Sequence, residues 1–273
     1  WTNKENHKKF MDWLRKKEGY NTMEDLYKIN IKVIIKNGGR GLLATYYNDS
    51  ITYLMSKMYP DYNWLLFRFS SKVPKDHWDN IENQKQFMDW LRKKEGYNTM
   101  EDLYKINTKV IRKYGGGGLL GQYYNDSFTK LLKALYPNYN WFEWKFYNVK
   151  RGFWKNKENH KKYIEWLKQE LGYTNMEDLY KMTCADIENN YGGGLIQLHY
   201  NYSPIAFVTS MYPNYNWIMW KFRGGVPQRY WQSKENCLKY IEWLKQELGY
   251  TNMEDLYKMS RRDFQKNYGE GMF

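Results

Sequence analysis

The chain is built from one unit of about 77 residues, written three times and then begun a fourth time. Each copy opens with a tryptophan, and the spacings between these tryptophans are 77, 76 and 77 residues: Trp1, Trp78, Trp154 and Trp231. Residues 10–30 recur unchanged as residues 87–107, and residues 163–182 recur as 240–259. A period of this length predicts tandem modules, with boundaries at 1–77, 78–153, 154–230 and a partial copy at 231–273.

The composition supplies enough apolar bulk for small cores. Aromatic residues make up 19% of the chain, including 28 tyrosines and 13 tryptophans. No long apolar run and no signal peptide occur, so we expect no membrane partner. Two non-equivalent cysteines predict no disulfide framework and fit an intracellular site, either the nucleus or a virus particle. Because the chain opens without methionine and stops inside a copy, we expect further domains of a longer chain.

The net charge of +13 is unevenly distributed among the copies. Lysines and arginines outnumber acids by 14 to 8 and 13 to 8 in the first two copies, but only by 9 to 7 in the third, and they equal them at 7 in the fourth. A basic field attracts polyanions, nucleic acid first and anionic membrane second. We therefore expect nucleic acid to be the partner and the first two copies to hold most of the contacts.

Residue spacing predicts helices along each copy. Phe10, Trp13 and Leu14 form an apolar stripe at i, i+3 and i+4 on a helix over residues 5–18 that ends at Gly19. The Thr-Met-Glu-Asp sequence at residues 22–25 caps a short helix that turns Leu26 and Tyr27 inward. A third helix begins at the capping residues that share one position in the four copies: Asn30, Asn107, Thr183 and Ser260. Asp186 and Asp263 complete capping boxes in the last two copies.

A glycine run follows the third helix and predicts a sharp turn. A further helix then begins at Leu42, and an Asn-Asp-Ser turn at residues 48–50 leads into a last helix over residues 51–59, stopped by Pro60. The predicted fold class is therefore all-α: a tandem array of modules of about five short helices each. The last two helices of each module resemble a helix-turn-helix, in which the second helix enters the DNA major groove.

The exposed positions of this helical pair change between copies while the frame before Asn30 is almost fixed. A repeat protein in which each module contacts different bases would show this pattern, and so would neutral substitution of exposed residues. The base-facing candidates are Thr45, Thr52, Tyr53, Ser56, Lys57, Gln122, Thr129, Lys130, Lys133, Gln197 and Thr209.

The glycine run and the basic residues around it are candidate phosphate contacts, because backbone N–H groups and cations both bind anions. A helix stop and turn explains the glycines equally well, and no Gly-Lys-Ser/Thr follows them as in a nucleotide-binding loop. The phosphate candidates are Lys36, Arg40, Gly41, Arg112, Lys113, Gly117 and Gly118.

Three aromatic sets recur near the end of each complete copy: Trp64/Phe67/Phe69, Trp141/Trp144/Phe146 and Trp217/Trp220/Phe222. Such rings stack on unpaired bases or, more often, staple neighbouring modules together. No nucleophile stands with a base, no metal triad is present, and Glu5 and its equivalents read as helix-start residues. We therefore expect neither an enzyme in this chain nor a cofactor.

The signature Trp-x-x-x-Glu-Asn, Glu-Asp-Leu-Tyr, Gly-Gly-x-Gly-Leu-Leu, Tyr-Tyr-Asn and Tyr-Pro-x-Tyr-Asn-Trp resembles that of uncharacterised tandem helical repeat proteins of large DNA viruses, fungi and algae. The resemblance covers essentially the whole chain and implies no particular activity. Three functions follow from the residues themselves. Binding of nucleic acid, double-stranded DNA before RNA, is favoured; a structural or protein-interaction array is the rival, and single-strand binding through aromatic platforms is a weaker alternative.

Overall fold

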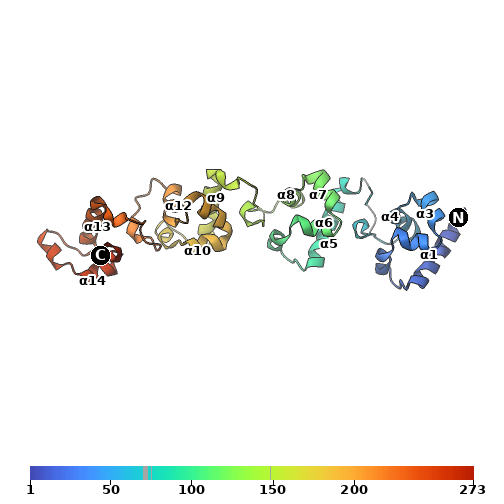
Figure 1. The fold of residues 1–273 in the computed structure, drawn as a ribbon, viewed down its shortest axis with the longest axis horizontal. Coiled ribbons are helices and arrows are strands. Elements are labelled where there is room, and N and C mark those ends of the chain that lie inside the picture. The colour runs from blue at the N-terminus through green and yellow to red at the C-terminus, as the bar shows by residue number, and fades with distance from the viewer. Residues whose placement is uncertain (70–72, 75, 148) are drawn as a thin grey trace. The chain divides into compact units, whose positions relative to one another are not determined.

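The computed structural model describes residues 1–69, 73–74, 76–147 and 149–273, and all regular secondary structure in these residues is helical (Figure 1). The predicted all-α class is therefore confirmed. Contacts divide the chain into two compact units, Trp1–Asn148 and Val149–Phe273. None of the helices in the described ranges is long and apolar enough to cross a membrane.

The first unit contains the first two sequence copies. Its α-helices in the first copy are α1 (Lys4–Glu18), α2 (Ile31–Lys36), α3 (Arg40–Tyr47) and α4 (Ile51–Met58), and those in the second are α5 (Ile81–Glu95), α6 (Thr108–Lys113), α7 (Gly117–Tyr124) and α8 (Phe128–Leu135). Short 3-10 helices lie at Glu24–Lys28, Leu66–Arg68, His77–Asp79, Glu101–Lys105 and Glu143–Lys145. The second of the five expected helices is therefore a 3-10 turn.

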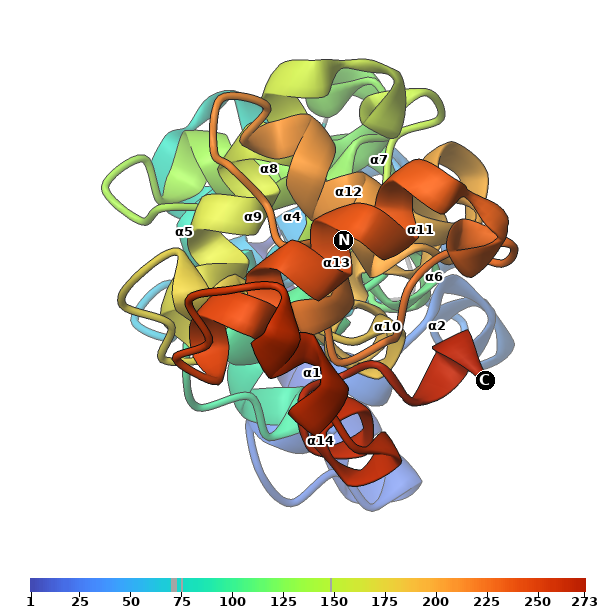
Figure 2. The same cartoon turned by 90° about the vertical axis from the view of Figure 1, so that its left-hand side faces the viewer.

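The second unit follows the same order of elements. Its α-helices are α9 (Lys157–Glu170), α10 (Cys184–Ile187), α11 (Gly193–Tyr200), α12 (Pro204–Met211), α13 (Lys234–Glu247) and α14 (Arg261–Lys266). A π-helical turn, Glu188–Gly192, joins α10 to α11, and 3-10 helices lie at Phe153–Lys155, Glu177–Lys181, Met219–Lys221, Tyr230–Gln232, Glu254–Lys258 and Glu270–Met272. Within this unit, Figure 2 shows α13 and α14 in front of α10 and α12.

Local capping chemistry sets most helix ends where the sequence predicts them. The side chain of Asn30 accepts a hydrogen bond from the N–H of Val33, and Thr183 and Ser260 form capping boxes with Asp186 and Asp263. The helix after the glycines begins earlier than expected, at Arg40 instead of Leu42. The residues just before Leu42 already form the first turn of α3.

The buried stripe of α1 differs from the predicted one. Met11 and Leu14 are fully buried and His7 is nearly so, whereas Trp13 is 47% exposed and Phe10 is half-buried. Residues 7, 11 and 14 follow the i, i+4, i+7 spacing of one helix face. The inward placement of Trp13 was therefore wrong, because the buried face is centred on residues 7, 11 and 14 and Trp13 lies about 100° from Leu14 around the helix.

A glycine at the corner between the second and third α-helices allows the first helix to approach closely. In the second copy, a Cβ atom on Gly116 would lie 2.6 Å from Phe87 Cζ and 2.7 Å from Ile111 Cγ2. Gly39, Gly192 and Gly269 meet equivalent rings: Phe10, Tyr163 and Tyr240. The glycine therefore provides the space in which the aromatic ring of the first helix packs.

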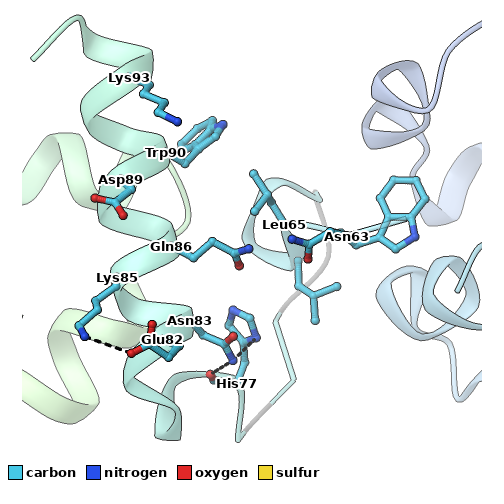
Figure 3. Close-up of a pocket in the computed structure, with 12 residues that line it drawn as sticks. Asn63, Leu65, His77, Glu82, Asn83, Lys85, Gln86, Asp89, Trp90 and Lys93 are labelled. Atoms are coloured by element: carbon cyan, nitrogen blue, oxygen red, sulfur yellow. Dashed lines mark hydrogen bonds and ion pairs between the residues drawn. The ribbon is translucent and has the colours of Figure 1, made fainter. Parts of the chain in front are cut away.

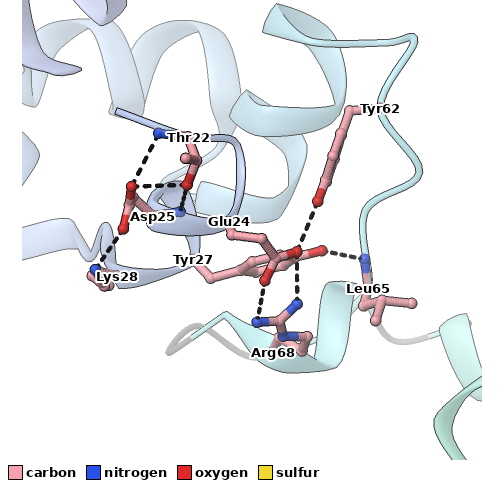
Figure 4. Close-up of polar contacts among 8 residues, drawn as sticks. All are labelled: Thr22, Glu24, Asp25, Tyr27, Lys28, Tyr62, Leu65 and Arg68. Carbon is pink, nitrogen blue, oxygen red and sulfur yellow. Dashed lines mark hydrogen bonds and ion pairs between the residues drawn. The ribbon is translucent and has the colours of Figure 1, made fainter. Parts of the chain in front are cut away.

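A tyrosine in the 3-10 turn ties the end of each complete copy back to its beginning. Tyr27 Oη accepts the backbone N–H of Leu65 at 2.8 Å (Figure 4), and Tyr104 and Tyr180 accept the equivalent N–H groups at the same distance. Glu24 accepts hydrogen bonds from Tyr62 and Arg68, and the Arg68 guanidinium lowers the pKa of its carboxyl group.

The aromatic sets divide between two cores. We call the segments Trp64–Phe69 and Trp217–Phe222 tail segments. Trp64 and Phe69 belong to the core of the first copy, whereas Phe67 belongs to the core of the second. In the second unit, Trp220 likewise packs with Tyr240 and Leu244 of α13. Phe67 and Trp220, the middle aromatic residues of their sets, thus pack into the core of the following copy.

The glycine corner yields a matched pair of substitutions in one copy. Gly116→Ala should lower the free energy of unfolding by about 1–3 kcal/mol, because its backbone angles suit alanine but its Cβ overpacks the core. Gly118→Ala should leave stability unchanged or slightly raised, because its Cβ would lie 3.6 Å from Trp78 Nε1 and alanine favours a helix. Urea unfolding of both variants checks this; equal losses would contradict the packing argument.

Candidate nucleic-acid interface

The candidate reading element is the helical pair α3–α4. Both helices have eight residues, and residues 48–50 join them. Asn48 and Asp49 adopt left-handed conformations with φ of 49° and 54°, and Ser50 Oγ accepts the N–H of Tyr53 at 3.2 Å. Asparagine and aspartate tolerate this conformation better than other non-glycine residues. The Asn-Asp-Ser turn therefore fixes where α4 begins.

A buried polar residue of the first helix anchors the residue just before this turn. His7 Nε2 lies 2.5 Å from the Trp1 carbonyl oxygen, and His7 Nδ1 lies 2.8 Å from Tyr47 Oη. In the third copy, His160 makes the same two contacts with Trp154 and Tyr200 at 2.5 and 2.7 Å. Sequence analysis missed this role, because the two histidines show no ligand spacing.

The second copy shows which hydrogen-bonding pattern the site requires. Gln84 Nε2 donates to the Trp78 carbonyl at 2.6 Å, and Tyr124 Oη donates to Gln84 Oε1 at 2.5 Å. An amide can donate only through nitrogen and accept only through oxygen. By analogy, His160 fills the position as a neutral imidazole with the proton on Nε2. Burial lowers the pKa of His160, and this favours the same neutral form.

The structure exposes most but not all of the base-facing candidates. Thr45, Tyr53, Lys57, Gln122, Lys130, Lys133 and Gln197 are exposed, and Ser56, Thr129 and Thr209 are half-buried. Thr52 is only 1% exposed and is withdrawn as a base contact, because its hydroxyl lies 2.9 Å from Ser50 Oγ inside the fold. Ser56 donates its hydroxyl hydrogen to the Thr52 carbonyl oxygen at 2.9 Å.

The charge on the last helix differs among the copies. Lys57 lies beside the ring of Tyr53, and Lys130 is exposed on α8. Lys133 forms an ion pair with Glu143 at 2.6 Å, so an approaching phosphate would have to compete with that carboxylate. The sequence of α12, Pro-Ile-Ala-Phe-Val-Thr-Ser-Met, carries no charge. Among the described residues, the last helix of a complete copy therefore carries exposed lysines only in the first unit.

The glycines proposed as phosphate contacts lie beside tryptophan rings or a basic side chain. A Cβ on Gly41 would lie 3.5 Å from the Trp1 ring, and one on Gly118 would lie 3.6 Å from Trp78 Nε1. Gly117 faces the side chain of Arg112, which forms an ion pair with Asp126. We withdraw Arg112 as a primary phosphate contact, because Asp126 already pairs with it; the three glycines stay candidates through their backbone N–H groups.

Three basic phosphate candidates are exposed to solvent. Lys36, Arg40 and Lys113 are exposed, and none of them forms an ion pair within the described residues of the first unit. The C-terminal turns of α1 and α2 lie together, since Asn37 Nδ2 donates to Glu18 Oε1 at 3.0 Å. Further exposed lysines flank these two turns.

We define the lysine face by four positions shared by the first two copies. It comprises Lys16, Lys17, Lys32 and Lys36 of the first copy and Lys93, Lys94, Lys109 and Lys113 of the second. All eight are exposed, and the third copy replaces them with Gln169, Glu170, Ala185 and Asn189. Sequence reasoning located the charge excess by copy but missed this face; aligning the copies position by position would have found it.

The aromatic platforms proposed for single strands are inside the cores. Trp64, Phe67 and Phe69 are 4–7% exposed, and the other two sets are buried except for half-buried Trp217. Stacking on a base requires an accessible ring face. These sets therefore cannot serve as stacking surfaces in the described fold. Among the described residues, no group of three or more histidine, cysteine or acidic side chains could hold a metal ion.

We call the buried polar residue at positions 7, 84 and 160 the polar anchor. In the third copy it predicts that stability depends on pH. Because the folded state holds His160 neutral with a lowered pKa, stability should be complete above about pH 6.5 and fall as the unfolded chain gains the proton at lower pH. His160→Gln should keep both hydrogen bonds, as Gln84 does, and should therefore lose less stability at low pH. Urea unfolding at several pH values measures the free energy of unfolding of both proteins.

His199→Gln is the matched control, because His199 is exposed and its ring lies 5.2 Å from that of His160. This variant should lose nearly as much stability at low pH as the unmodified chain, since burial is the main cause of the lowered His160 pKa. An unchanged pH dependence in His160→Gln would contradict the proposed neutral anchor.

The chain was also compared with known proteins. No family model, curated protein or solved structure matches it. The resemblance to tandem repeats of large DNA viruses, fungi and algae therefore stays an expectation. The function of the chain is inferred from the surfaces described above.

Proposed function

We propose that this chain is a modular nucleic-acid-binding protein, a tandem array of helical modules whose first unit carries most of the contacts to double-stranded DNA. The lysine face is the observation that carries the proposal. It places the same four exposed cations in each of two copies and neutral or acidic residues in the third. Exposed cations release counterions from a nucleic-acid backbone when they bind.

Ion pairs distinguish this face from the rest of the basic charge. Lys28, Lys105, Lys181 and Lys258 each pair with an aspartate three residues earlier, at 2.6–2.7 Å, in all four copies. Such lysines contribute to the frame of the module, whatever its partner. The charge that differs among copies is concentrated on the lysine face, and this supports a specific role for the first unit.

The proposal favours a DNA duplex over other nucleic acids for two reasons. The three aromatic sets considered for stacking on single strands are buried, except for half-buried Trp217. The deep, narrow major groove of A-form RNA does not admit side chains, whereas that of DNA accepts a helix. If bases are read, the exposed residues of α4 and α8 are the candidates, Tyr53, Lys57 and Lys130 first among them.

The first test removes the lysine face of the second copy. Lys93→Gln, Lys94→Gln, Lys109→Gln and Lys113→Gln together should weaken duplex binding and reduce the slope of log affinity against log salt by about 0.9 for each phosphate that the variant no longer neutralises. Fluorescence anisotropy over a salt series measures both. We expect no change in helical content, since all four side chains are exposed.

A matched control removes the same number of charges from paired lysines. Lys8→Gln, Lys28→Gln, Lys85→Gln and Lys105→Gln all break ion pairs within the module. This variant has the same net charge as the test variant but should keep most of the salt slope. Equal losses in both variants would show that only total charge matters and would contradict a defined binding face.

The second test asks whether α4 reads bases. Tyr53→Lys with Ser56→Lys transfers the lysines of α8 to α4, and a reader should change its preferred duplex by tenfold or more, since a good base contact is worth about 1–3 kcal/mol. Thr2→Lys with Asn6→Lys adds the same charge at exposed positions and should raise affinity for all duplexes alike. Selection from a random duplex pool compares them. Identical preferences in both variants would assign the variation in α4 to surface drift.

A structural or protein-interaction array is the second candidate function. The stapling of Phe67 and Trp220 into the next copy favours it, because such junctions set a fixed relation between neighbouring modules. The two functions differ in their response to salt. A protein-interaction array whose charge is incidental would bind duplexes only through its total charge, so the test variant and the control variant would show the same salt slope.

A further inference from the structure

Two junctions in the chain use one and the same acceptor. Phe67 contacts the rings of Trp78, Phe87 and Trp90 with centroid distances of 6.2, 5.0 and 5.3 Å. In the second unit, Trp220 contacts Trp231, Tyr240 and Trp243 at 6.3, 5.2 and 5.4 Å. The acceptor is therefore a triad of rings, one from the opening tryptophan and two from the first helix.

Each tail segment also brings a cation to the last ring of the triad. Arg68 lies over Trp90 at 5.7 Å, and Lys221 lies over Trp243 at 5.9 Å. Leu65 and Trp90 point toward a common pocket between the tail segment and α5 (Figure 3). At the same junction, a Cβ on Gly115 would lie 2.7 Å from the carbonyl oxygen of Phe67. A tail segment thus supplies a ring, a cation and a backbone carbonyl.

The first copy holds the same triad without a tail segment on it. Trp1 and Phe10 lie 5.2 Å apart at 80°, close to the 5.6 Å and 78° of Trp78 and Phe87. Trp1 is 39% and Trp13 is 47% exposed, whereas Trp78 is 2% exposed. Gly38, the equivalent of Gly115, has no atom within 4 Å of an added Cβ. The acceptor is therefore formed in advance and accessible.

We propose that the Trp1/Phe10/Trp13 triad is a docking site for the aromatic and cationic tail segment of a further module of the same kind. Continuity with the two described junctions identifies this occupant, because it provides each group that the triad accepts there. Two exposed tryptophans on one face are otherwise costly in water. Lys17 of the lysine face lies 4.8 Å from the centre of the Trp13 ring, but the three rings themselves carry no charge, so the docking proposal does not rest on the nucleic-acid proposal.

The test supplies the missing segment in its natural register. A copy of residues 60–77 is fused directly before Trp1 of the full chain, so that the added sequence meets Trp1 as residues 60–77 meet Trp78. The emission of Trp13 is isolated by subtracting that of the same protein with Trp13→Phe. We expect a blue shift, lower quenching by acrylamide and a higher melting temperature of the first unit.

The control is the same extension with alanine at the positions that copy Phe67 and Arg68, and it should give none of these changes. If the extension disturbs folding, as judged by circular dichroism, a peptide of the same sequence is titrated into the unmodified chain with the same readout. Equal protection by the alanine control, or none by either form, would overturn the proposal. Protection by a DNA duplex or by raised protein concentration alone would assign the triad to another partner and also overturn it.

Discussion

The aromatic ring of the first helix is the contact on which each copy depends. In the second copy, Phe87 packs against the Gly116 corner and also receives Phe67 from the preceding tail segment. One fully buried ring therefore joins the α6–α7 corner to the tail segment of the preceding copy. Because the corner has no room for even one methyl group, the glycine and the ring are required together.

The frame and the variable surface are separate parts of the molecule. Caps, the tyrosine ties and the polar anchor at residues 7, 84 and 160 recur with nearly the same geometry. Lysines at the ends of the first and second α-helices do not recur in the third copy. A fixed frame with a changing charge suits a protein whose modules share a fold and differ in how strongly they hold a polyanion.

The sequence predicts local features well and tertiary ones poorly. The starts of α2 and α4 follow from Asn30 and Ser50, because a cap acts on the next few residues. The exposure of Trp13, the burial of Thr52 and the tryptophan facing Gly41 depend on partners distant in sequence, and no local pattern predicts them. A charge total for each copy does not locate the lysine face, because it does not say which positions carry the lysines.

Footprinting of lysine reactivity tests the central proposal most directly. The full chain is acetylated with and without a short DNA duplex at low salt, and modification at each lysine is read by mass spectrometry. The proposed interface predicts protection of the lysine face, with little change at the ion-paired Lys28 and Lys105. Formation of a complex that leaves the lysine face fully reactive, or no complex at all at low salt, would contradict it.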